Sequence, residues 1–144
     1  MIKKSTQELL KILTSGMKLS DYYAKYENEL YDINLTDYLE ILLEEKKLKK
    51  ATAIKNAHLE RTYGYQLFNG TRTPSRNSLL CLGVGMKLNL EEMQMLLKIA
   101  HQAPLYARDL RDSAIIYGIN NKCNMTKLEE LLLELGYAGL CTKE

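Results

Sequence analysis

Residues 45–93 read EKKLKKATAIKNAHLERTYGYQLFNGTRTPSRNSLLCLGVGMKLNLEEM, and this stretch decides the fold. It begins with two short segments of helical pattern, 49–59 and 60–70, which follow each other with almost no linker. The second segment ends at Gly70, a favourable residue just past the end of a helix because it adopts positive φ without strain. The stretch therefore predicts two short helices joined by a tight turn.

The second half of the stretch continues in helices. Pro74 marks a turn before an apolar segment, 75–88, that predicts another helix. Asn89 and Glu92 have the spacing of a capping box, in which each residue satisfies a free backbone N–H of the other. This pair predicts a further helix that begins directly after Asn89 and covers 90–100.

The positive charge of the chain is concentrated between Lys46 and Arg76. Eight Lys or Arg and one acid, Glu60, give this block a net charge of +7, while 1–45 carries −4 and 77–144 carries −1. A basic block that contains a helix, a turn and a second helix favours binding to a polyanion, most simply DNA. The alternative is a solvated lysine face, which is what many charge runs are.

Length and composition limit the other possibilities. A chain of 144 residues corresponds to one domain with small extensions, and 46% hydrophobic residues with only two prolines favour an all-α protein. No run of 18 apolar residues and no signal peptide are recognisable, so we expect a cytoplasmic protein without membrane contact. Three widely spaced cysteines match neither a disulfide framework nor a metal site.

Helix signals divide the chain into an N-terminal helical extension (1–33), a five-helix domain (34–101) and a C-terminal helical hairpin (102–144). Ser5 and Glu8 predict a first helix, Ser20 a second, and Asn34 or Thr36 the third. The second helix is rich in tyrosine, which we interpret as a packing face, with a base-stacking surface as the alternative: Tyr22, Tyr23, Tyr26 and Tyr31. The last hairpin is predicted as helices over about 109–120 and 125–135, the latter capped by Asn124.

An internal similarity links two parts of the chain at an offset of 35 residues. Residues 76–97 align without gaps on 111–132, and seven of the 22 positions are identical. Each copy predicts an apolar helix, a Lys-x-Asn turn and a capped amphipathic helix. Either the hairpin was duplicated or two leucine-rich helix pairs resemble each other by chance.

The stretch 45–93 resembles the phage-repressor (Xre/Cro-like) helix-turn-helix family of transcriptional regulators. The family's G-x-R-x-P-S signature is matched by Gly70, Arg72, Pro74 and Ser75. Further matches are spread over the helices at the expected spacing: Glu45, Lys46, Leu48, Arg61, Leu79, Leu80, Leu82, Leu90 and Glu92. The resemblance covers about a third of the chain. It departs from the family at His58, where a turn glycine is usual, and at Gly64, where a buried Ile or Val is usual.

The resemblance implies a lambda-repressor-like domain with a recognition helix at about 60–69 that enters the major groove of DNA. By position in the family, the base-reading residues would be Arg61, Thr62, Tyr65 and Gln66. The alternative for Arg61 is an ion pair with Glu60 or an acidic flank, and the alternative for Tyr65 is packing. The phosphate-binding residues would be Lys50, Asn69, Thr71, Arg72 and Arg76. Arginine suits guanine and glutamine suits adenine, because each can form two hydrogen bonds to the base edge. With Gly64 in its middle, this helix would be anchored through Tyr63, Leu67 and Phe68.

These features together predict a bacterial, sequence-specific double-stranded DNA-binding regulator, most simply a repressor. The alternative is a protein-interaction adaptor or antitoxin-like partner that keeps the helix-turn-helix scaffold without reading DNA. We expect no enzyme activity, cofactor or metal, since no catalytic motif is present. We also expect a homodimer, because one such module reads only a few base pairs. Candidate dimer residues are Leu133, Tyr137 and Leu140, and the tyrosine-rich helix is the competing surface.

Overall fold

The computed structural model describes residues 4–27 and 33–141, which form nine α-helices and no strand. The chain divides into two compact units, 1–33 and 34–144. Unit 1 contains α1 (Thr6–Leu13) and α2 (Leu19–Tyr26). Unit 2 contains α3 (Leu35–Lys46), α4 (Lys50–Asn56), α5 (Arg61–Asn69), α6 (Arg76–Gly85), α7 (Leu90–Ile99), α8 (Leu110–Asn120) and α9 (Met125–Glu134). The predicted all-α class is confirmed.

The helices of unit 1 begin where local signals place them, with one correction. The Ser5 side chain accepts the Glu8 N–H at 3.1 Å and caps α1, as predicted. Ser20 does not cap α2, because that helix already begins at Leu19 after an N-cap residue, Lys18, without a capping side chain. Tyr22 and Tyr26 are buried, with ring centroids 5.4 Å apart, while Tyr23 is exposed. The prediction for Tyr31 lies outside the described residues.

Most helices of unit 2 begin at a residue whose side chain accepts a backbone N–H of the first turn. Of the two candidates for the start of α3, Asn34 is the cap, and its side chain accepts from the Asp37 N–H. Asn89 and Glu92 form the complete capping box of α7. The start of α9 at Asn124 is also as predicted. Because these signals are local, they could be recognised before the tertiary structure was known.

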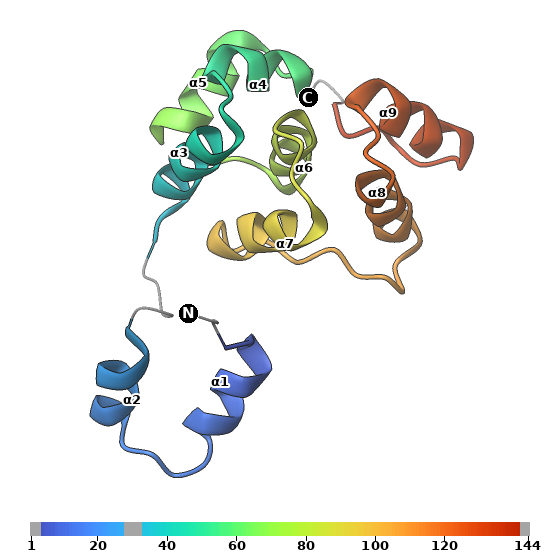
Figure 1. Cartoon of the computed structure of the whole chain (residues 1–144). Helices are drawn as coiled ribbons and strands as arrows, with labels where there is room; N and C mark the ends of the chain where they lie inside the picture. The colour runs from blue at the N-terminus through green and yellow to red at the C-terminus, as the bar shows by residue number, and fades with distance from the viewer. Residues whose placement is uncertain (1–3, 28–32, 142–144) are drawn as a thin grey trace. The chain divides into compact units, whose positions relative to one another are not determined.

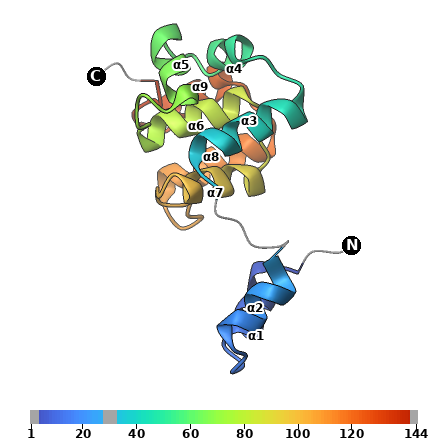
Figure 2. The same ribbon diagram turned by 90° about the vertical axis from the view of Figure 1, so that its left-hand side faces the viewer.

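One apolar core runs through all of unit 2. α6 lies between the α3–α5 helices and the α8–α9 hairpin (Figure 1). Figure 2 views the same helices from the α3–α5 side, so that they overlap from front to back. Seven of the ten residues of α6 are buried. Most core side chains come from 34–101, such as Leu39 and Leu96, and others come from 102–144, such as Ile115 and Leu132. The C-terminal hairpin therefore shares its core with the helix-turn-helix segment.

The two similar hairpins, α6–α7 and α8–α9, turn in the same way. Lys87 and Lys122 both adopt left-handed backbone conformations, with φ of 60° and 54°. The next residue in each turn donates its N–H to a glycine carbonyl of the preceding helix, at 3.0 Å from Leu88 to Gly83 and 2.9 Å from Cys123 to Gly118. This is the hydrogen-bond pattern of a Schellman helix end. The sequence offset of 35 residues thus corresponds to a repeated backbone structure.

The helices of the described part of the chain are short. None of them is both long and apolar enough to cross a membrane.

Candidate nucleic-acid interface

The helix-turn-helix is formed by α4, a tight turn and α5. His58 occupies the turn with φ of 58°, so a histidine adopts the left-handed conformation for which the similar family uses glycine. α4 and α5 pack closely because Gly64 has no side chain: a Cβ added there would lie 2.5 Å from Ile54 Cγ2. Ile54 therefore fills from α4 the space that a buried Ile or Val at position 64 would fill from α5.

The remaining anchors of α5 are those predicted. Leu67 and Phe68 are buried in the core. Tyr63 is half-buried, and its hydroxyl lies 2.9 Å from the Ser78 hydroxyl on α6. These contacts fix the rotation of α5, so that Arg61 and Thr62 are exposed while Leu67 and Phe68 face inward.

The N-terminus of α5 carries an acid that sequence reasoning did not assign. The Glu60 carboxylate accepts the N–H groups of Tyr63 at 2.7 Å and Thr62 at 3.0 Å. These two hydrogen bonds hold the pKa of the Glu60 carboxyl below its usual value. The S/T/D/N rule for N-caps excludes Glu, which is why the cap was missed. Its negative charge stands directly before Arg61.

The predicted base-reading residues share one side of α5. The Arg61 guanidinium lies over the Tyr65 ring, 5.8 Å from its centroid, one helical turn away. Tyr65 is half-buried and packs against the core, so its ring supports Arg61. Thr62 is exposed beside them, and Gln66 is half-buried at the next turn.

The C-terminal end of α5 is tied to the following loop. The Arg72 Nε donates to the Gln66 side-chain oxygen at 3.3 Å, and the Arg72 backbone N–H donates to the Gln66 carbonyl at 3.3 Å. The Arg72 guanidinium also lies 5.6 Å from the centroid of the Tyr63 ring. A predicted base reader and a predicted phosphate binder are therefore bonded to each other.

The loop after α5 is shaped by its own polar side chains. Gly70 ends the helix with φ of 83°, as predicted, and the Asn69 side chain accepts the Thr71 N–H at 2.9 Å. Asn69 and Thr71 are both exposed. They leave the loop backbone on the surface next to Arg72.

Part of the basic block is neutralised by ion pairs with acids of the same chain. Lys50 pairs with Glu40 at 2.8 Å on the surface, and Lys46 pairs with Glu92 at 2.8 Å in a partly buried position. Together with the Arg76 pair described next, these acids lower the block's formal charge from +7 to +4. The basic residues of the block without an ion pair to another described residue are Lys47, Lys49, Lys55, Arg61 and Arg72.

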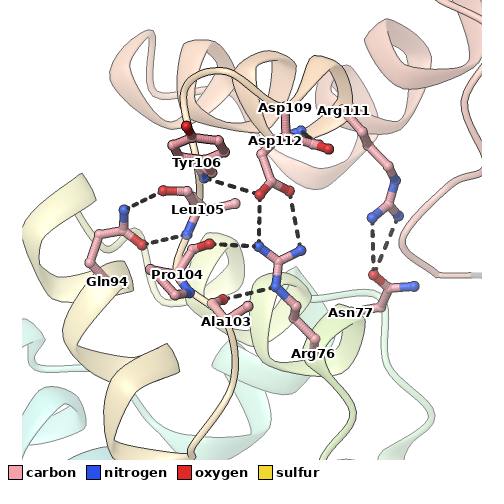
Figure 3. A network of polar contacts seen from close by, with 10 residues as sticks. All are labelled: Arg76, Asn77, Gln94, Ala103, Pro104, Leu105, Tyr106, Asp109, Arg111 and Asp112. Atoms are coloured by element: carbon pink, nitrogen blue, oxygen red, sulfur yellow. Dashed lines mark hydrogen bonds and ion pairs between the residues drawn. The ribbon is translucent and has the colours of Figure 1, made fainter.

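The structure does not place Arg76 with the other predicted phosphate binders. Its guanidinium forms a two-point pair with Asp112 of α8, at 2.9 and 3.1 Å (Figure 3). The same guanidinium donates to the carbonyls of Ala103 at 2.9 Å and Pro104 at 3.1 Å. All these partners lie in the C-terminal segment, whose packing the sequence comparison with a helix-turn-helix could not include. We therefore assign Arg76 an internal, structural role.

No family model, no curated protein and no solved structure matches this chain.

Proposed function

We propose that this chain is a sequence-specific double-stranded DNA-binding transcriptional regulator, most simply a repressor. The observation that carries the proposal is the arrangement of α4 and α5 around a left-handed turn, with Arg61, Thr62 and Gln66 on the outer side of α5. Such a helix presents its N-terminal residues to base edges in the major groove while flanking groups hold phosphates.

In this proposal, Arg61 and Gln66 read bases and Thr62 adds a shorter polar contact. The Tyr65 ring packs under the Arg61 guanidinium and holds it in position. Phosphates on either side are held by residues of the loop after α5 and the start of α4: Asn69, Thr71, Arg72 and Lys50. Lys50 exchanges its exposed partner Glu40 for a phosphate, a change of small cost because surface ion pairs contribute about 0–1 kcal/mol. A cytoplasmic homodimer that binds two half-sites completes the proposal.

A second candidate function is a protein-interaction adaptor on the same scaffold. It is favoured by the ion pairs of Lys46, Lys50 and Arg76 with acids of the chain. It is also favoured by Glu60 at the N-terminus of α5. A surface that binds DNA gains most of its affinity from unpaired cations, and those pairs reduce it.

Selection of bound sequences from a pool of random duplexes tests the proposal, followed by fluorescence anisotropy on the selected duplex over a range of salt concentrations. We expect one enriched sequence and an affinity that falls steeply with salt, because phosphate neutralisation releases counterions. Arg61→Ala or Gln66→Ala should relax the base preference by about 1–3 kcal/mol. Arg72→Ala should weaken binding to all duplexes and flatten the salt dependence.

Arg108→Ala is the matched control, since Arg108 is exposed in the loop between α7 and α8, outside the basic block. This variant should bind like the wild type. If the wild type bound no duplex at low salt, the adaptor function would replace the proposal.

A further inference from the structure

A second polar surface of unit 2 lies in a groove between the turns of the two similar hairpins, α6–α7 and α8–α9. The groove has a volume of about 920 Å³, which is the size of pockets that hold small organic ligands. Its walls include both Lys-x-Asn turns, 87–89 and 122–124, and the end of α4 with the turn after it. None of the DNA-facing residues proposed above lines it.

The cations of this groove come from three separate elements. Lys55 lies in the last turn of α4, Lys87 follows α6 and Lys122 follows α8. His58 adds an imidazole from the turn between α4 and α5. Among the described residues, no acidic side chain lines the groove, and none of these lysines has an ion pair. The carboxylate of Glu92, which closes the capping box with Asn89, pairs with Lys46 and does not line the groove. Three cations held around one hollow without acids create a positive potential there.

The positions of Lys87 and Lys122 are set by the backbone. Both are the left-handed residues of their turns, with φ of 60° and 54°. A non-glycine residue costs on the order of 1 kcal/mol in that conformation. Glycine is the usual residue at such a helix end. This chain also uses other residues there, since Lys47 and His101 have φ of 55° and 59°.

Amide groups and an apolar floor complete the groove. Asn89 and Asn124 use their side-chain oxygens to cap α7 and α9, at 2.8 and 2.9 Å from the Glu92 and Lys127 nitrogens. Their side-chain NH2 groups remain as donors. The apolar lining comes from the four hairpin helices and the first turn: Val84, Leu88, Leu90, Ile119 and Met125. The lysines favour an anionic ligand, and the apolar lining favours a ligand whose anionic group is attached to an apolar ring or chain.

We infer that this groove binds a phosphorylated small organic molecule of about nucleotide size. Its phosphates lie among Lys55, Lys87 and Lys122, and its ring or chain lies on the apolar floor. The inference goes beyond the proposed DNA binding and does not depend on it, because the two sites use different residues.

The test is an NMR titration of the ¹⁵N-labelled full chain with ADP and GDP, with adenosine and inorganic pyrophosphate as separate arms. We expect at least one nucleotide to shift the amides of 87–89 and 122–124 in a saturable way. Lys87→Gln/Lys122→Gln, which keeps a long side chain at both turns, should bind about tenfold more weakly. Lys18→Gln/Lys98→Gln removes the same charge from exposed positions outside the groove and should bind like the wild type.

Retained dispersion of the amide spectrum shows that each variant is folded. The inference is overturned if neither nucleotide shifts these amides at millimolar concentration, or if both double variants bind equally. Adenosine or pyrophosphate binding as tightly as the nucleotides would also overturn it, since the ligand would then lack either the anion or the organic body. A duplex that shifts the same amides would make the groove part of a DNA surface instead.

Discussion

The guanidinium of Arg76 lies 2.9 and 3.1 Å from the two carboxylate oxygens of Asp112, and Asp112 is buried. At the offset of 35 residues, Arg76 corresponds to Arg111 and Asn77 corresponds to Asp112. Arg111 donates to the Asn77 side-chain oxygen at 3.3 Å (Figure 3). The starts of α6 and α8 therefore make the same contact twice. The arginine lies on α6 in one contact and on α8 in the other, as across a two-fold axis. α7 against α8 and α6 against α9 repeat this exchange at the level of helices.

Arg76→Ala should destabilise unit 2 by about 2–4 kcal/mol, because it leaves the buried Asp112 carboxylate without its charged partner. Asp112 also accepts the Tyr106 N–H at 3.0 Å, so the loop before α8 loosens as well. Urea unfolding followed by circular dichroism measures the change. The matched control, Arg111→Ala, loses only bonds to neutral groups, the Asn77 side chain and the Ala138 carbonyl, and should cost about 1 kcal/mol. Equal costs for the two variants would show that the Asp112 pair has no special role.

Gly64→Ala should cost about 1–3 kcal/mol, because its new Cβ would overlap Ile54. In combination with Ile54→Ala, the cost should be smaller than the sum of the two single costs by about 1 kcal/mol, since truncation makes room for the methyl group. Unfolding of the four members of this cycle gives the coupling energy.

Gly85→Ala provides the contrast for this cycle. A Cβ at Gly85 would lie 2.6 Å from the backbone of Ala53 and Ala57, and backbone atoms cannot be truncated. Ile54→Ala should not relieve that variant. If the costs of Gly64→Ala and Ile54→Ala were simply additive, the two residues would not share the space between α4 and α5.

The helices and their boundaries could be predicted because their causes are local. Asn34, Asn89 and Asn124 cap helices through side chains that reach three residues along the chain. The prediction that Ser20 caps α2 was wrong because a local signal can be ambiguous. Ser is also acceptable inside the first turn of a helix, where Ser20 lies. Glu60 was missed because it caps α5 with an uncommon residue type.

The candidate site could be predicted only in part, because its residues depend on tertiary partners. The sequence places Arg76 next to the loop that follows the recognition helix, but Asp112, 36 positions later, determines what it binds. Likewise, Gly64 departs from the similar family, and only the structure explains it: the Ile54 side chain fills the space next to Gly64. Neither relationship leaves a periodic signal in the sequence.

Leu133→Asp should weaken self-association if the C-terminal hairpin forms the proposed dimer. Leu140 is only 3% exposed and belongs to the core, so its assignment to a dimer surface is not retained; Leu133 is 64% exposed on α9. Leu110→Asp is the control on α8, where Leu110 is 74% exposed. Sedimentation at tens of micromolar should show a monomeric Leu133→Asp and a dimeric Leu110→Asp. The reverse result would place the dimer surface on α8. Truncation after His101 would be a poor test, since α8 and α9 supply core residues.

Alkaline pH should destabilise the protein through Cys81. Burial on α6 is the main cause that raises the pKa of the Cys81 thiol, and the neighbouring Cys141 thiol, with Sγ atoms 3.2 Å apart, adds to it. In the unfolded chain, a cysteine ionises near pH 8.5. The folded form keeps its proton above that pH and the unfolded form loses it. The stabilisation is therefore complete below about pH 8.5 and is lost as the pH rises, by about 1.4 kcal/mol per pH unit.

Cys81→Ala tests this dependence, because it removes the ionising group while keeping a small apolar side chain. Other groups also titrate in this range, so the measured quantity is the difference in slope between variant and wild type, from urea unfolding under reducing conditions between about pH 8 and pH 10. Cys81→Ala should be less stable at neutral pH, because it leaves a small cavity, but its stability should fall less steeply by about one proton. Parallel curves of stability against pH for Cys81→Ala and the wild type would contradict this prediction. They would mean that the Cys81 thiol ionises equally in the folded and the unfolded chain. Its complete burial in α6 makes ionisation costly in the folded chain.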